Sequence, residues 1–285
     1  MRAFSFCHFA CVSAGLLIST LASSPTWAGT RAIDGDASDW VGTPSATVHA
    51  AVVSAGEWIY TGQAGDSRTD PTGDDANYDL TEVRFTRDDL WLYGLVRYAD
   101  ITNTNEIHLA IGFELDNNPA DSDGMNFFGH QSGTGFASAS DHPEYQLSIH
   151  NTPSPVTQIE RFRNGESTWT APPTPGWSVW ISEPNNLVEF RIALADLELT
   201  TTTSMRVMLV TFDNGTTSDP GGLAWNNSED TTVDYITTDA LDVMTVGATP
   251  GDSSWDRDLS NGQIDVLNAV DLAVLPVELS AFGLE

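Results

Sequence analysis

Short runs of alternating apolar and polar residues recur along the chain, with turn-forming residues between them. Alternation with a period of two is typical of strands that have one buried face. Helical periodicity is almost absent, and only 195–197 favours a single helical turn. We expect at most one short strand within an otherwise irregular 41–56, and strands over 57–61, 79–86, 90–98, 106–115, 145–150, 156–163, 166–170, 177–181, 187–194, 204–212, 233–236 and 264–272.

Two pairs of these strands are predicted to form hairpins. Arg87-Asp88-Asp89 separates 79–86 from 90–98, and Asn164-Gly165 is a strong hairpin-turn signal after 156–163. Strand 90–98 is apolar on both faces, which indicates a central position in its sheet. The sequence therefore predicts an all-β protein: an antiparallel two-sheet β-sandwich, jelly-roll-like, with long acidic loops.

The first 28 residues are typical of a secretory signal peptide. An arginine at position 2 precedes an apolar run over 10–22, and Thr26-Trp27-Ala28 supplies a cleavage site. The run is shorter than the roughly 20 residues of a spanning helix, and no later segment predicts a membrane span. We expect a secreted protein, extracellular or at the cell surface, with the sandwich over 29–274. Both cysteines, Cys7 and Cys11, lie in the signal, so no disulfide is expected in the mature chain.

The chain has 40 acidic and 11 basic residues, for a formal net charge of −29, and every basic residue is arginine. Such a charge argues against nucleic acid or an anionic membrane as a partner, because their phosphate groups would be repelled. It is compatible with a solvated surface adapted to high salt, with loops that bind calcium, or with both. The sequence assigns no oligomeric state.

The stretch Ile33-Asp34-Gly35-Asp36-Ala37-Ser38-Asp39-Trp40 opens the predicted mature chain. Asp-Gly favours a tight turn, because glycine accepts positive φ without steric cost. Ile33 and Trp40 are apolar anchors on either side. The carboxylates between them are expected to face outward or onto a cation.

This motif resembles the start of family 9 carbohydrate-binding-module-like domains, to which DOMON-type sandwiches are related. Further segments resemble the same family, in the same order: 73–83 followed by 90–98, an acidic Asp-x-Asn-Pro loop within 111–120, and a late strand and turn over 188–197. The resemblance implies a calcium-containing β-sandwich of secreted bacterial proteins. The tail 275–285 resembles the start of a linker that precedes C-terminal sorting domains.

Two acidic loops are candidate calcium sites. Calcium takes six to eight oxygen ligands from carboxylates, amides and carbonyls, and flexible loops can supply them. Each cluster is alternatively an acidic turn in an acidic protein. The candidate ligands are Asp66, Asp70, Asp74 and Asp75 in the first loop, with Asn77 beside them, and Asp116, Asn118, Asp121 and Asp123 in the second.

Tryptophans are the candidates for carbohydrate contact, because a flat indole stacks on the apolar face of a sugar ring. Trp169, Trp177 and Trp180 surround a proline-rich loop and are the candidate platform. Trp40, Trp58 and Trp91 lie in apolar patterns and are expected in the core. The structural alternative is that these three rings only close the ends of the sandwich and contact no sugar.

No sequence pattern indicates catalysis. The chain lacks Gly-x-Ser-x-Gly, His-Glu-x-x-His and a phosphate-binding loop. With so many carboxylates, a pair at the spacing of a glycosidase is uninformative. His108 and His150 fall in predicted strands and are interpreted as structural, and His130 with His142 is a weaker candidate metal pair. No spacing singles out a haem-ligating methionine.

These patterns predict a secreted, non-catalytic, carbohydrate-binding-like sandwich that is stabilised by calcium. Its expected partner is an extracellular or cell-wall polysaccharide. The alternative is a structural or adhesive cell-surface protein that has the same fold and binds no sugar, and a glycoside hydrolase is the third interpretation. An exposed tryptophan platform favours the first, and an unpaired edge strand or apolar patch favours the second.

Overall fold

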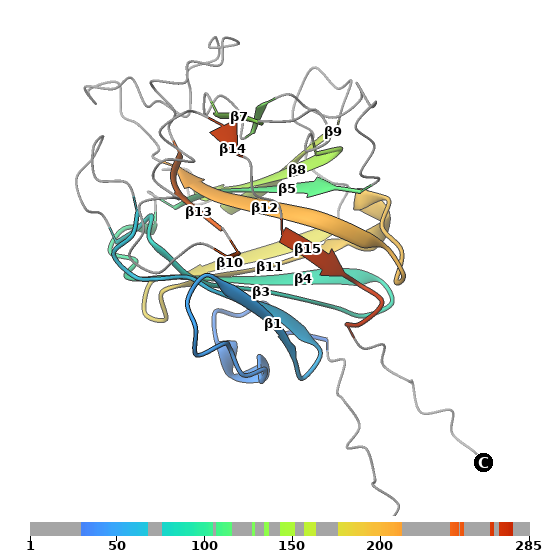
Figure 1. Ribbon diagram of the computed structural model, residues 1–285, viewed down its shortest axis with the longest axis horizontal. Helices are drawn as coiled ribbons and strands as arrows, with labels where there is room; N and C mark the ends of the chain where they lie inside the picture. Colours follow the sequence, from blue (N-terminus) through green and yellow to red (C-terminus); the bar gives the residue numbers. More distant parts are fainter. Residues whose placement is uncertain are drawn as a thin grey trace, which may run out of the picture.

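The computed structural model describes residues 30–67, 76–104, 107–115, 127–128, 134–136, 143–151, 157–163, 176–212, 240–244, 246–247, 263–264 and 268–275. Within them the chain forms strands and two short 3-10 turns, η1 (Ala37–Asp39) and η4 (Leu194–Leu197), and no α-helix. The expected helical turn corresponds to η4. The structure thus confirms an all-β protein built as a two-sheet antiparallel sandwich (Figure 1).

Sheet A has the strand order β1-β2-β3-β4-β11-β10, and all its neighbouring strands are antiparallel. The expected hairpin is β3–β4, and β4 occupies the expected interior position between β3 and β11. The strands are β1 (Ala50–Ser54), β2 (Glu57–Thr61), β3 (Leu80–Arg87), β4 (Trp91–Tyr98), β11 (Leu187–Ala193) and β10 (Trp177–Ser182).

Sheet B faces sheet A and has the order β13-β12-β5-β8-β9. A further strand, β15, pairs with the first half of β12 on the edge that β13 uses farther along. The strands are β5 (His108–Glu114), β8 (Tyr145–Asn151), β9 (Thr157–Arg163), β12 (Ser204–Phe212), β13 (Ala240–Val243) and β15 (Asn268–Asp271).

A small third sheet has the order β14-β7-β6, and its β14–β7 pair is parallel. Figure 1 shows β7 and β14 on the side of sheet B that faces away from sheet A. The strands are β6 (Phe127–Phe128), β7 (Thr134–Phe136) and β14 (Gln263–Ile264).

One apolar core fills the space between sheets A and B. Phe85 and Phe190 reach it from sheet A, and Ile111 and Leu209 reach it from sheet B. All four are fully buried. Burial of such side chains contributes roughly 1.5–3 kcal/mol each. Where a strand alternates in sequence, the alternation therefore selects the face that packs inward.

Some short strands differ from expectation. The single strand expected over 264–272 is divided between β14 and β15, which belong to different sheets. β6, β7 and β13 were not expected, because two to four residues are too few to show alternation. The strands expected over 166–170 and 233–236 lie outside the described residues.

The outer face of sheet A is covered by residues 31–42, which we call the N-terminal strap. Trp40 of the strap is buried with Tyr93, Leu95 and Leu187 of the sheet. A fully buried glutamate, Glu57, accepts hydrogen bonds from the backbone N–H groups of 41 and 42 and pairs with two arginines, 31 and 84. The strap thus provides the second cover that a sheet with two apolar faces requires.

Candidate metal centre

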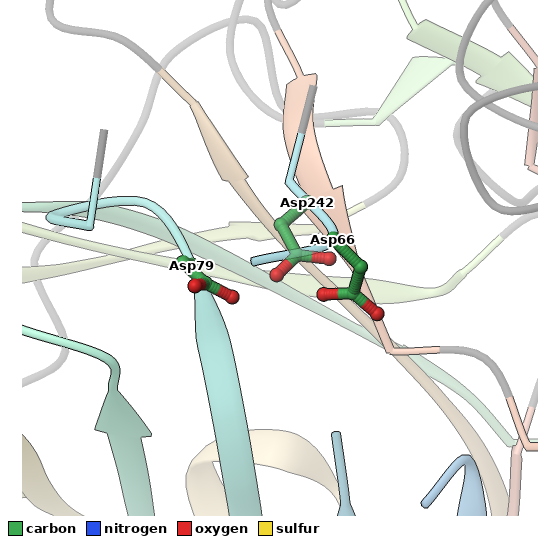
Figure 2. Close-up of side chains that lie close together, drawn as sticks. All are labelled: Asp66, Asp79 and Asp242. Atoms are coloured by element: carbon green, nitrogen blue, oxygen red, sulfur yellow. The ribbon is translucent and has the colours of Figure 1, made fainter. Parts of the chain in front are cut away.

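Three aspartates that are distant in sequence converge at one end of the sandwich. Asp66 lies in the loop after β2, Asp79 directly precedes β3, and Asp242 lies on β13. One carboxylate oxygen from each lies within 4.8 Å of the others, and Figure 2 shows the three groups turned toward a common region. Because β2 and β3 belong to sheet A and β13 belongs to sheet B, the cluster joins the two sheets.

Backbone N–H groups hold the carboxylates in place. Leu80 donates to Oδ2 of Asp242 at 2.6 Å, and Val243 donates to Oδ1 of the same residue at 2.7 Å. Gly65 donates to Oδ2 of Asp79 at 2.6 Å, which ties the loop after β2 to the start of β3. Backbone hydrogen bonds therefore fix Asp79 and Asp242, two of the three members of the cluster.

Burial disfavours the charged form of the carboxylates in this cluster. The three aspartates are at most 6% exposed. Burial, followed by the charges of Asp66 and Asp79, raises the pKa of Asp242 well above its ordinary value, although the hydrogen bond from Leu80 opposes this shift. Three ionised carboxylates in such a site require a compensating positive charge. The arrangement therefore suits a bound cation, or else retained protons.

Two further buried groups lie against the cluster. Nε2 of His49 is 3.4 Å from Oδ2 of Asp66, and burial lowers the pKa of His49, so the ring is neutral at pH 7. Burial and the charge of Asp242 raise the pKa of Tyr98 far above its ordinary value. Neither His49 Nε2 nor the Tyr98 hydroxyl has a hydrogen-bond partner among the described residues. The Tyr98 hydroxyl is thus available to a ligand at the centre, whereas Nε2 of His49 faces the Asp66 carboxylate.

The donor set can hold a metal ion. Ca–O distances of about 2.3–2.6 Å place oxygens on opposite sides of the ion about 4.6–5.2 Å apart, close to the spread of these carboxylates. The cluster can act as a cross-link between sheets.

Of the predicted metal ligands, the structure places Asp66 in this cluster. Asn77, its predicted neighbour, instead has an amide oxygen that accepts from the backbone N–H groups of 102 and 103. The other predicted ligands lie outside the described residues: Asp70, Asp74, Asp75, Asp116, Asn118, Asp121 and Asp123.

Sequence reasoning did not select Asp79 or Asp242 as ligands. Asp79 lies in the acidic run at 73–83, immediately before a strand, and this position could have suggested it. Asp242 is a charged residue between Leu241 and Val243 in a short apolar segment. A charge within an apolar segment is a signal of a paired or ligated group, but it does not reveal the partners.

The candidate tryptophans occupy different environments. Trp177 is half-buried and packs against the core with Val179 and Ile181. Trp180 is 52% exposed on the opposite face of β10, the edge strand of sheet A. The two rings therefore lie on opposite sides of one strand and do not share a flat surface. Trp169 lies outside the described residues.

Trp180 is supported from one side by the turn at Gly35. A Cβ on Gly35 would lie 2.6 Å from Cδ1 of Trp180, so only glycine allows the backbone to approach the ring this closely. Oε2 of the buried Glu189 accepts from the Gly35 N–H at 2.7 Å, and Asn185 donates to the Gly35 carbonyl at 2.5 Å. Gly35 has the expected positive φ, at 80°.

The acidic side chains of the opening turn cap their own backbone. Oδ1 of Asp34 accepts from the Asp36 N–H, and Oδ1 of Asp36 accepts from the Ser38 N–H. Oδ2 of Asp39 accepts from the Ala32 N–H at 2.8 Å. These carboxylates stabilise the turn and lie apart from the buried cluster.

Other expectations are met in part. Trp40 and Trp58 are buried as expected, whereas Trp91 is only partly buried, under the Arg191 guanidinium.

The backbones of His108 and His150 lie in strands and pair directly across β5 and β8. His130 and His142 lie outside the described residues. No helix in the described part of the chain is long and apolar enough to cross a membrane.

Comparison with known proteins adds no identification. No family model matches the chain, and no curated protein matches its sequence.

Proposed function

We propose that this chain is an exported, non-catalytic binding module of the family 9 carbohydrate-binding-like type, stabilised by calcium. The observation that supports the proposal best is the buried Asp66–Asp79–Asp242 cluster between the sheets. The sandwich architecture and the order of the family-like motifs agree with it. A signal-like segment at 1–28 supports export to a compartment where calcium is plentiful.

Calcium is favoured over softer metals because every donor in the cluster is a carboxylate oxygen. Hard cations prefer oxygen, whereas zinc and copper sites draw on thiolate and imidazole ligands. The remaining ligand positions of a calcium ion would be filled by carbonyls or water. The ion would offset most of the buried negative charge and tie the loop at 66, the start of β3 and β13 together.

Thermal unfolding at constant ionic strength tests the calcium site. A ligand that binds only the folded state stabilises it by about 2.7 kcal/mol at 100 times its Kd. For a chain of this size we expect a rise in Tm of several degrees, since roughly 1 kcal/mol corresponds to about 2–4 °C. An unchanged Tm after chelation and after calcium addition would contradict the proposal.

A matched pair of variants separates the site from general acidity. Asp242→Asn should abolish the calcium response and leave the calcium-free protein folded, because it removes one of three repelling carboxylates. Asp89→Asn removes the same charge from an exposed residue in the turn after β3, at the opposite end of that strand. This control should keep the full response to calcium.

Trp180 supports the glycan-binding part of the proposal. Its half-exposed indole is fixed against the Gly35 turn, so little side-chain freedom is lost when a sugar stacks on it. Affinity electrophoresis with neutral soluble polysaccharides should show retardation that Trp180→Ala removes. Leu90→Ala, at another exposed apolar residue, should leave it unchanged. No retardation across a broad glycan panel would favour the alternative function.

The alternative is an adhesive or structural surface protein. β1 is an edge strand of sheet A, and Val53 on it is 51% exposed. Exposed edge strands with apolar residues can pair with another chain. Concentration-dependent self-association that Val53→Lys abolishes, together with the absence of glycan binding, would support this role.

A further inference from the structure

His49 has an unusual backbone position beside the metal centre. It precedes β1 with φ of 53°, a left-handed conformation that few non-glycine residues adopt. Its N–H donates to the Thr61 carbonyl at 2.7 Å, and its carbonyl accepts from the Gly247 N–H at 2.7 Å. Residues held in such conformations often serve a site that the surrounding structure enforces. The backbone of His49 is thus fixed from two sides.

The imidazole ring of His49 connects two side chains. Nδ1 lies 3.1 Å from the Tyr60 hydroxyl, and Nε2 lies 3.4 Å from Oδ2 of Asp66. The ring is 3% exposed, and Tyr60 is 1% exposed. Tyr60, His49 and Asp66 therefore form a buried chain that leads to the carboxylate cluster.

We propose that His49 is the positioning residue of the metal centre, orienting Asp66 toward the bound ion. The proposal rests on the ion binding proposed above and assigns the ring a place outside the ligand shell. His49 donates its Nε2–H to Asp66, and the Tyr60 hydroxyl donates to Nδ1. Metal-binding carboxylates commonly receive such hydrogen bonds, which fix their orientation.

The charge of Asp66 selects this tautomer. An N–H at Nε2 is attracted to the carboxylate, whereas a bare lone pair at the same position would face an anionic oxygen. With the proton at Nε2, Nδ1 is the acceptor, so the Tyr60 hydroxyl must be the donor. The 3.4 Å separation is long for a hydrogen bond, and ion binding should shorten it by drawing the two residues together.

Calorimetric calcium titration of the full chain tests the role of His49. His49→Asn should weaken calcium binding by about 10–100-fold, the usual effect of removing such a support. Asparagine accepts a left-handed backbone, so this variant should fold. Tyr60→Phe should weaken binding by a smaller factor, because the ring keeps its contact with Asp66 and loses only the hydrogen bond that supports Nδ1. Tyr93→Phe, a second buried tyrosine whose hydroxyl donates to Asp88, is the matched control and should bind as wild type.

Nitrogen-15 chemical shifts of the His49 ring give a readout that a purely structural role would not move. We expect a protonated Nε2 and a bare Nδ1, with a shift change at Nε2 when calcium binds. An unchanged Kd in His49→Asn, or a proton on Nδ1 in the calcium-bound protein, would overturn the role of His49. Absence of calcium binding in wild type would instead overturn the ion site itself, so the two failures are distinguishable.

Discussion

At the residue scale, Gly94 shows why one glycine interrupts the most apolar strand of sheet A. It lies on β4 between Phe85 of β3 and Phe190 of β11, its direct partners across the sheet. The two phenyl rings meet edge to face, with centroids 6.5 Å apart. A Cβ on Gly94 would overlap the Phe190 ring. The absent side chain makes room for an aromatic pair in the core.

We predict that Gly94→Ala destabilises the protein by roughly 1–3 kcal/mol, the usual cost of overpacking a core. Phe190→Leu should reduce this cost when the two are combined, because the clash is with the ring. Denaturant unfolding of the single and double variants measures the coupling. Strictly additive free energies would show that the ring is not the cause.

Glu189 is a buried glutamate on β11 that binds the N-terminal strap. Its side chain is fully buried and accepts from the N–H groups of Asp34 and Gly35 and from the indole of Trp40. Burial raises the pKa of Glu189, although these hydrogen bonds oppose the shift. The carboxyl group therefore holds its proton more tightly in the folded chain than in the unfolded chain.

The sign of the resulting pH dependence follows from linkage. A raised folded-state pKa contributes stability that is complete below the ordinary glutamate pKa and is lost as pH rises through the folded value. The difference in unfolding free energy between wild type and Glu189→Gln should therefore shift against wild type as pH rises through this interval. Parallel unfolding titrations across acidic pH measure it, and a difference independent of pH would contradict the shift.

At the element scale, the β1–β2 hairpin has a two-residue turn in which both residues are left-handed. Ala55 has φ of 48° and Gly56 has φ of 81°. Turns of this type match the twist of the flanking strands, and they favour Asn-Gly or Asp-Gly. Alanine in the first position is strained, since its Cβ crowds the backbone.

Ala55→Asn should therefore stabilise the hairpin, by about 1 kcal/mol, because asparagine tolerates the left-handed region. The expected readout is a higher denaturant midpoint with an unchanged slope. The control is Ala51→Asn on β1, where Ala51 packs against the core. The same substitution there should destabilise the protein and lower the midpoint. A lower midpoint for Ala55→Asn would show that the turn has another constraint.

The long strands could be predicted from local sequence, and their predicted bounds agree with β3, β4, β8, β11 and β12 to within a residue or two. β13 was not predicted because it has only four residues, and one of them is a buried aspartate. Local sequence cannot distinguish a ligated carboxylate within a strand from a polar loop residue. Short elements that depend on long-range partners are thus the ones that a periodicity argument misses.

At the scale of the whole molecule, charge is the dominant property. The net charge of −29 arises with only 11 arginines to offset it. Some of these arginines form ion pairs with buried glutamates: Arg84 pairs with Glu57 and Glu82, and Arg206 pairs with Glu114. The remaining acidic excess repels itself and destabilises the compact state at low ionic strength.

We predict that the Tm of the calcium-free protein rises with NaCl, because the Debye length falls from about 10 Å at 0.1 M to about 3 Å at 1 M. KCl should act equally, since the effect is screening. Scanning calorimetry in the presence of a chelator measures it. A Tm that is constant with salt would mean that the acidic residues are already spaced far enough apart to be harmless.

The sequence by itself determined the all-β class, the principal strands and the Asp-Gly turn at Gly35, because alternation and turn chemistry are local properties. It also indicated that an acidic loop near Asp66 could bind a cation. Only the tertiary structure decided which carboxylates meet, since Asp79 and Asp242 reach Asp66 through the packing of two sheets. Packing likewise placed Trp177 against the core and Trp180 in solvent, because successive positions on a strand face opposite sides.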